Sequence, residues 1–225
     1  MQDKTREPQY QFLLDLREQH GLTRLGLMSS QTWGVDPKRL LFLLARYKFV
    51  AKMLSGRKRV LEIGCADAFG TRVVLQEVGS VTATDFDPVF IEEAKTRPDE
   101  RWPIELRVHD MLSGPLAENF DGAYALDVLE HIQPEDEERF LHNLTLSLDD
   151  RGVAILGMPS LESQVYASEG SKAGHVNCKS GPDLKSVLER YFSFVFIFSM
   201  SDEVVHTGFQ KMAHYLLALC CEPIR

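Results

Sequence analysis

Two carboxylic acids and a histidine lie close together in the middle of the chain, and a second histidine follows later. Asp127, Glu130 and His131 stand where an apolar run ends and a turn begins. His175 lies in the long segment 159–180, which has little helix or strand pattern. Carboxylates and imidazoles can accept a proton from a reacting group. We predict Glu130, His131 and His175 as catalytic, as a base or as groups that position an acceptor. The alternative is a structural role, in which Glu130 and His131 bond only to backbone.

A second pattern, of small residues, predicts a ligand that contains adenosine. An apolar run breaks into Gly64-Cys-Ala66-Asp-Ala68, and the next apolar run ends in Asp85. A strand that turns tightly into a helix, beside a strand tipped by a carboxylate, is typical of a doubly wound sheet that binds adenosine. Small residues let the backbone approach such a ligand, and Asp85 can accept hydrogen bonds from both ribose hydroxyls.

The spacing of this turn disfavours a dinucleotide cofactor. A dinucleotide site needs glycine at the first, third and sixth positions, which here hold Gly64, Ala66 and Phe69. A phosphate-binding loop ending in Gly-Lys-Ser/Thr is absent from the sequence as well. Because a methyl group disfavours positive φ, we expect ordinary dihedral angles at Ala66 and Ala68.

The elements that must position these residues alternate between strands and helices, which predicts a parallel sheet. Strands are expected near 59–64, 80–84, 103–108, 121–126 and 152–157. Helices are expected near 8–19, 38–54, 69–78, 88–96, 135–148 and 182–191, with a loop through Met28, Trp33 and Gly34. Two final apolar stretches, 193–199 and 212–220, have no helix between them and must pair antiparallel. Ligands bind beyond the carboxyl ends of the strands in such sheets.

These blocks together resemble the class I S-adenosylmethionine (SAM)-dependent methyltransferases of types 11, 12 and 23. The family turn reads acid-x-Gly-x-Gly-x-Gly, and Ala66 and Ala68 replace two of its glycines. The resemblance implies an α/β fold, a doubly wound, seven-stranded, mostly parallel sheet with a C-terminal antiparallel strand. It implies that Asp85 binds the ribose, Phe86 lies along the adenine, and Asp110 accepts from the adenine amino group. The full set of cofactor-binding residues that it implies is Glu62, Gly64, Cys65, Ala66, Asp85, Phe86, Asp110, Met111 and Asp127.

The Asp127-x-x-Glu130-His131 segment with a later His175 resembles one group of O-methyltransferases, including ubiquinone-pathway and small-RNA 2′-O enzymes. Some of these hold a divalent metal with such a set, but they carry Glu where this chain has the shorter Asp127. We predict no metal ligands and keep a divalent metal at these four residues as the alternative.

The function that follows is a SAM-dependent methyltransferase, an O-methyltransferase acting on a hydroxyl of a small molecule. Residues 26–39 resemble methyltransferases of bacterial surface-sugar biosynthesis, which implies a sugar or nucleotide-sugar acceptor. Basic residues could also supply a mouth for an anionic acceptor: Lys38, Arg39, Arg46 and Lys172. The alternatives are a non-catalytic SAM-binding sensor or partner subunit, suggested by the two alanines in the turn, and an RNA methyltransferase.

Composition limits the remaining classes. With 225 residues, 44% of them hydrophobic, the chain suits a SAM-binding domain over 38–225 preceded by a helical cap over 1–37. A net charge of −8, with no basic tract beyond Arg57-Lys58-Arg59, makes nucleic acid an unlikely partner. No apolar run suits a membrane span or a signal peptide, and four cysteines lack Cys-x-x-Cys spacing. We expect a cytoplasmic monomer or homodimer with reduced thiols.

Overall fold

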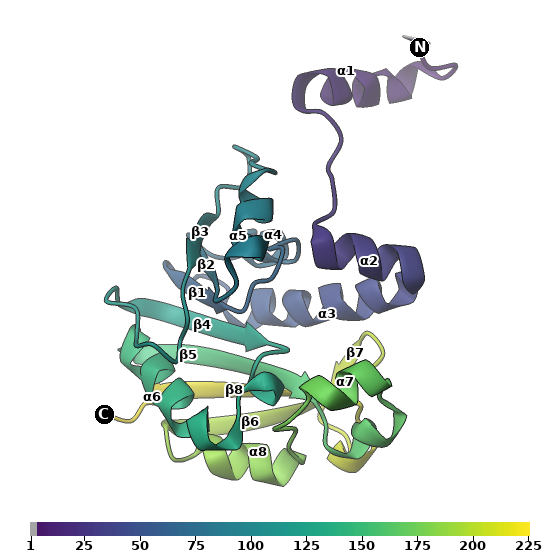
Figure 1. The fold of residues 1–225 in the computed structure, drawn as a ribbon. Helices are drawn as coiled ribbons and strands as arrows, with labels where there is room; N and C mark the ends of the chain where they lie inside the picture. The colour runs from purple at the N-terminus through teal and green to yellow at the C-terminus, as the bar shows by residue number, and fades with distance from the viewer. Residues whose placement is uncertain (1–3) are drawn as a thin grey trace.

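One eight-stranded sheet organises the chain (Figure 1). The computed structural model describes residues 4–225, so residues 1–3 of the predicted cap lie outside the described residues. The strand order is β3-β2-β1-β4-β5-β8-β6-β7. The strands are β1 (Val60–Ile63), β2 (Val81–Asp85), β3 (Glu105–Val108), β4 (Phe120–Leu126), β5 (Leu148–Pro159), β6 (Phe192–Ser201), β7 (Val204–His206) and β8 (Tyr215–Pro223). Strands β1 to β5 pair in parallel, whereas β8 lies antiparallel between β5 and β6. The predicted α/β fold with a reversed C-terminal strand is confirmed.

Helices cover both faces of this sheet. The α-helices are α1 (Gln11–His20), α2 (Leu27–Val35), α3 (Pro37–Met53), α4 (Thr71–Leu75), α5 (Pro88–Lys95), α6 (Glu137–Ser147), α7 (Glu169–Gly174) and α8 (Gly181–Leu188). The 3-10 helices are η1 (Pro8–Tyr10), η2 (Leu129–His131), η3 (Pro134–Asp136), η4 (Glu162–Tyr166) and η5 (Gln210–Met212). No helix among residues 4–225 combines the length and the apolar character needed to cross a membrane.

The core has two parts, one on each face of the sheet. Buried residues of α3, α4 and α5 pack with β1, β2 and β4 on one face, with Tyr47 and Ile91 among them. Residues of α6 and α8, including Phe140 and Leu184, pack on the other face. Helix α1 has no buried residue and projects away from this body (Figure 1). The sheet therefore offers its carboxyl edge, beyond β1 to β5, as the place where ligands meet loops.

Several elements differ from the sequence-based expectation. The loop predicted through Met28, Trp33 and Gly34 is wrong, because these residues form α2. Its helical state depends on a tertiary contact: the N–H of Ser29 donates to the carboxylate of Asp67, 38 residues away, at 2.7 Å. The segment 159–180 contains η4 and α7. Ser168 is the N-cap of α7, because its side chain accepts a hydrogen bond from the N–H of Ser171.

The sheet also has one strand more than the seven predicted. Strand β7 was expected to be part of a turn, but it pairs antiparallel with the end of β6. Asp202 adopts a φ of 51° in the connection, a value that closes a tight hairpin. Strand β5 starts earlier than expected, at Leu148, because an irregular register at Phe120 keeps it paired with β4.

Candidate active site

The turn after β1 has a left-handed backbone at three positions. Gly64 has a φ of 74°, Ala66 of 44° and Ala68 of 52°. The ordinary dihedral angles expected at the two alanines are therefore wrong. Hydrogen bonds explain the difference: the N–H of Ala66 donates to the Asp85 carboxylate at 2.9 Å, and the N–H of Ala68 donates to the carbonyl of Cys65 at 2.8 Å. Each alanine at positive φ costs about 1 kcal/mol.

Asp85 joins the tip of β2 to this turn. Its side chain is buried, and its two carboxylate oxygens accept from the N–H groups of Ala66 and Asp87, both at 2.9 Å. A carboxylate oxygen offers two lone pairs, so both oxygens can still accept a hydrogen bond from a ligand hydroxyl. Phe86 is 72% exposed beside it, and Asp110 at the tip of β3 is exposed too. Met111, the neighbour of Asp110, is buried in the core instead.

Glu62 lies beneath the turn and is fully enclosed. It accepts from the hydroxyl of Tyr47 at 2.9 Å and from that of Thr71 at 2.5 Å. Burial raises the pKa of Glu62 to about 7, although these hydrogen bonds oppose the shift. The carboxylate thus supports the first turn of α4 from below, and its predicted contact with a cofactor stays a prediction. Cys65 is buried as well, with its thiol near the carbonyl of Ala66.

The three residues predicted to be catalytic lie together. The imidazole rings of His131 and His175 meet edge to face, with centroids 5.2 Å apart. One ligating atom from each of these rings and one carboxylate oxygen of Glu130 all lie within 4.8 Å of one another. Backbone bonds hold this arrangement, because the N–H groups of Val176 and Asn177 donate to the carbonyl of Glu130 at 2.8 and 3.0 Å. A segment far along the chain is thereby fixed against η2.

Hydrogen bonds also determine which nitrogen of each imidazole is free. The Nδ1 of His131 lies 2.9 Å from the carbonyl oxygen of Gly174, and a carbonyl oxygen can only accept. The Nδ1 of His175 lies 2.8 Å from the side-chain oxygen of Gln164. Both Nδ1 atoms therefore carry a proton, so in each neutral ring the lone pair lies on Nε2. Burial, followed by the neighbouring His131, lowers the pKa of His175 below its usual 6.5.

Glu130 is the least solvated member of the cluster. It is 1% exposed, and its Oε2 has no hydrogen-bond partner. Burial and the nearby Asp127 raise the pKa of Glu130 well above its ordinary value. A neutral Glu130 can donate, and an ionised one can accept a cation, so the carboxyl group is suited to proton transfer or to ligation.

Asp127 belongs to a separate pair. It accepts from the guanidinium of Arg46 at 2.7 Å, and the same guanidinium lies 3.7 Å from the centroid of the Tyr215 ring. Asp127 itself has a φ of 56° at the end of β4. Arg46 holds one oxygen of Asp127, and of the four suggested metal ligands Glu130, His131 and His175 are those whose ligating atoms lie within 4.8 Å of one another.

A cavity of about 460 Å³ opens in front of these groups. We call it the acceptor cavity; its lining includes Met28, Gln31, Thr32, Arg39, Leu43, Arg46, Asp127, Glu130, His131 and His175. Helices α2 and α3 supply one wall and the histidine cluster supplies the other. The contribution of α2 could not be predicted from the sequence, because its contact with the turn after β1 leaves no signal in helical periodicity. Gln164 and Tyr215 could not be predicted either, since neither lies in a recognisable pattern.

Comparisons with known proteins agree with this geometry. A family model described as a methyltransferase domain matches residues 60–152. The N-methyltransferase NodS from Bradyrhizobium japonicum WM9, in complex with S-adenosyl-L-homocysteine (SAH), is similar with a TM-score of 0.63 and 19% identity, covering 85% of this chain and 91% of that one. The DhpI–SAH complex is similar with a TM-score of 0.62 and 16% identity, covering 87% and 91%. The CurJ carbon methyltransferase is similar with a TM-score of 0.60 and 15% identity, covering 85% and 60%. No curated protein matches the chain.

Residues 60–152 match a methyltransferase domain, and the fold of the chain is that of the class I SAM-dependent methyltransferases. The match to the family model covers the strands from β1 to the start of β5. NodS and DhpI are both solved in complex with SAH, the demethylated form of SAM. The solved relatives include an N-methyltransferase and a carbon methyltransferase, so the fold does not fix the accepting atom.

Proposed function

We propose that this methyltransferase moves the methyl group of SAM to a hydroxyl of a small molecule bound in the acceptor cavity. The observation that carries the proposal is the pair of imidazoles whose Nε2 atoms both keep a free lone pair. A hydroxyl nucleophile must lose a proton as it attacks, whereas a carbon or amine acceptor does not lose its proton in the same way. Two bases on one wall of the cavity suit the hydroxyl best.

The cofactor is proposed to lie along the turn after β1. Asp85 accepts from the ribose hydroxyls, Phe86 lies along the adenine, and Asp110 accepts from its amino group. Gly64, Ala66 and their neighbours let the backbone approach the ligand closely. In this arrangement Asp127, which lines the acceptor cavity, would be the predicted cofactor residue nearest to the acceptor.

In the proposed reaction the acceptor oxygen attacks the methyl carbon as the carbon–sulfur bond breaks. The electron pair of that bond stays on sulfur, which becomes the neutral thioether of SAH. The hydroxyl proton passes to the Nε2 of His175 or His131. Holding the oxygen in line with the methyl group supplies several kcal/mol, up to about 10 in favourable cases, and the base adds about a hundredfold or more.

The acceptor is proposed to be a sugar or nucleotide-sugar. The cavity lining offers polar contacts to such a molecule, because it presents hydrogen-bonding side chains such as Gln31 and Thr32 and the cations Arg39 and Arg46 beside apolar ones. Incubation with methyl-labelled SAM and a panel of nucleotide-sugars, followed by mass spectrometry, tests this. We expect one panel member to gain a single methyl ether. Methylation at nitrogen or carbon would overturn the hydroxyl assignment.

The same experiment separates the enzyme from its alternatives. A sensor or partner subunit would bind SAM and SAH by calorimetry but methylate nothing in any panel. An RNA methyltransferase would show RNA affinity that falls steeply with salt.

A metal-assisted version of this reaction is a second candidate. The specific observation in its favour is the set of one carboxylate oxygen and two imidazole nitrogens within 4.8 Å, each imidazole fixed through its other nitrogen. Glu130, His131 and His175 would hold the ion, which would lower the pKa of a bound hydroxyl. Calorimetric titration of Mg²⁺ and Mn²⁺ into the chelator-treated protein tests this site. Activity that is untouched by the chelator would contradict it.

A further inference from the structure

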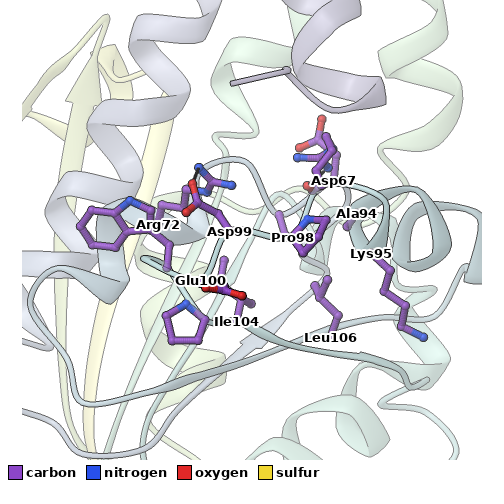
Figure 2. A pocket seen from close by; sticks show the side chains of 13 residues that line it. Asp67, Arg72, Ala94, Lys95, Pro98, Asp99, Glu100, Ile104 and Leu106 are labelled. Carbon is purple, nitrogen blue, oxygen red and sulfur yellow. Dashed lines mark hydrogen bonds and ion pairs between the residues drawn. The ribbon is translucent and has the colours of Figure 1, made fainter. Parts of the chain in front are cut away.

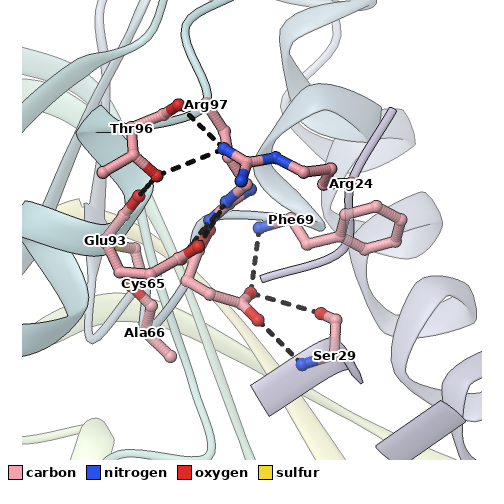
Figure 3. Close-up of polar contacts among 9 residues, drawn as sticks. Arg24, Ser29, Cys65, Ala66, Phe69, Glu93, Thr96 and Arg97 are labelled. Atoms are coloured by element: carbon pink, nitrogen blue, oxygen red, sulfur yellow. Dashed lines mark hydrogen bonds and ion pairs between the residues drawn. The ribbon is translucent and has the colours of Figure 1, made fainter. Parts of the chain in front are cut away.

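The start of α2 is fastened to the turn after β1 by one carboxylate. The N–H of Ser29 donates to Asp67 at 2.7 Å, and its hydroxyl lies 3.2 Å from the other carboxylate oxygen. Both side chains are almost completely buried, Ser29 at 1% and Asp67 at 4% exposed. Figure 3 shows Ser29 facing the turn, with dashed lines to the carboxylate that lies between Ala66 and Phe69. A carboxylate is well placed at a helix N-terminus, where backbone N–H groups need acceptors.

A glycine immediately before α2 makes this approach feasible. A Cβ added to Gly26 would lie 2.2 Å from the Cβ of Asp67 and 2.5 Å from its Oδ2. Real Cβ atoms do not come this close, so a side chain at position 26 would push α2 away from the turn. Gly34, in the same helix, has nothing within 4 Å of such a Cβ. The two glycines thus form a test position and its control.

The turn that carries Asp67 is strained, and a cavity lies on its other side. The residues before and after Asp67, Ala66 and Ala68, both have positive φ. Behind Asp67 lies a cavity of about 370 Å³, bordered by Arg72, Ala94 and Leu106 among others (Figure 2). Arg97 is the cation that reaches the turn from that side, and it donates to the carbonyl of Asp67 at 2.5 Å. A strained segment beside a cavity keeps its conformation only where bound groups favour it.

Helix α2 in turn forms part of the acceptor cavity. Met28, Gln31 and Thr32 line it, on the side opposite His131 and His175. The hydrogen bonds between Ser29 and Asp67 therefore join this wall of the cavity to the turn after β1.

We propose that Asp67 is a positioning residue that couples cofactor binding to the acceptor cavity, because the cofactor and α2 both select the same strained conformation of the turn. The inference rests on the proposed cofactor position, and it adds a role for α2. The cofactor contacts the turn on one side and α2 contacts it on the other, and both contacts stabilise the same strained conformation. Each contact therefore makes the other more favourable. Such coupling is reciprocal in free energy.

Hydrogen exchange over residues 27–35, measured with and without SAH, tests the coupling directly. In the wild-type protein we expect SAH to slow exchange of α2 by about tenfold, a typical size for coupling between two sites. In Gly26→Ala this effect of SAH should shrink to less than about twofold, and SAH affinity should weaken by up to the same factor of about ten. The control Gly34→Ala should keep the full effect of SAH. Asp67→Asn keeps the shape of the side chain but removes its charge. In this variant the effect of SAH on exchange of α2 should lie between that in Gly26→Ala and that in the wild-type protein.

Several outcomes would overturn the proposal. If SAH binds the wild-type protein and exchange of α2 does not change, the coupling is absent while the cofactor assignment stands. If Gly26→Ala keeps the effect of SAH, Asp67 does not transmit it. If calorimetry shows that SAH does not bind the wild-type protein, both the proposed function and this inference fail. A variant that merely lost stability would speed exchange equally with and without SAH, so the ratio of the two rates isolates the positioning role.

Discussion

The two halves of the carboxyl edge are built in different ways. In the cofactor half, the contacts join residues close in sequence: Asp85 bonds to Asp87 two positions away and to Ala66, 19 positions away. In the acceptor half, Arg46 meets Asp127 from 81 positions away, and His131 meets Gly174 from 43. A half made of short-range contacts leaves a motif in the sequence. A half made of long-range contacts leaves isolated residues.

The largest effect expected from this division comes from removing both bases. The double variant His131→Ala/His175→Ala should lower kcat by about 10² to 10⁴, since no other imidazole on that wall would accept the proton. SAH affinity should stay within threefold of the wild type. His142→Ala, at an exposed position of α6, is the control and should leave both quantities unchanged. A loss of SAH affinity equal to the loss of kcat would show that the two histidines hold the cofactor and do not act on the acceptor.

The next effect concerns stability in the cofactor half. The pKa of Glu62 is about 7 in the folded protein and 4.5 as its ordinary value. Between these values the unfolded chain releases this proton while the folded protein keeps it, so the folded state loses stability as pH rises from 4.5 to 7. The full loss is about 3 kcal/mol. Glu62→Gln should remove most of this dependence in urea denaturation at pH 5 and pH 8. Glu138→Gln, exposed on α6, should leave it intact.

How much the sequence could predict follows the same division. The Gly64 turn and Asp85 were recognisable because strand ends and small residues recur at fixed distances in the chain. Helix α2 was not recognisable in the sequence, because Asp67 supplies the hydrogen-bond acceptor that its first turn needs. The positive φ of Ala66 was not recognisable either, since the hydrogen bond to Asp85 outweighs the preference of alanine for negative φ. Conformational propensity describes what a residue prefers in isolation, whereas the conformation of these residues is determined by hydrogen-bond partners elsewhere in the chain.

The pH dependence of activity is expected to come from the acceptor half. Burial and His131 lower the pKa of His175 from 6.5, so this imidazole is neutral and able to accept a proton at pH 7. We expect kcat to be level from pH 8 down to 6.5 and to fall by up to tenfold per pH unit on the acidic side of the folded pKa. In His131→Gln the acidic fall should move to higher pH, because the neighbouring positive charge is gone. An unmoved profile would exclude His175 as the base.

The smallest effect tests the strain in the turn. Ala66→Gly removes the penalty of positive φ, which stabilises the folded protein, but glycine also makes the unfolded chain more flexible, which opposes folding. The net result should be a free energy of unfolding that is higher by about 0.5 kcal/mol. Ala167→Gly is the matched control, because Ala167 has a φ of −67°. It should lower the free energy of unfolding by about 0.4 to 1 kcal/mol. The same sign for both variants would mean that the turn is not strained.

The central claim is that a SAM-type cofactor lies on the turn after β1 with its ribose held by Asp85. Calorimetric titration of SAH into Asp85→Ala tests it, beside Asp121→Ala as control. Asp121 also accepts two backbone N–H groups, those of Lys58 and Arg59, but at the opposite end of the strands. We predict that SAH binding weakens by at least about thirtyfold in Asp85→Ala, from hydrogen bonds to a charged group, and by less than threefold in Asp121→Ala. Undiminished affinity in Asp85→Ala would contradict the account.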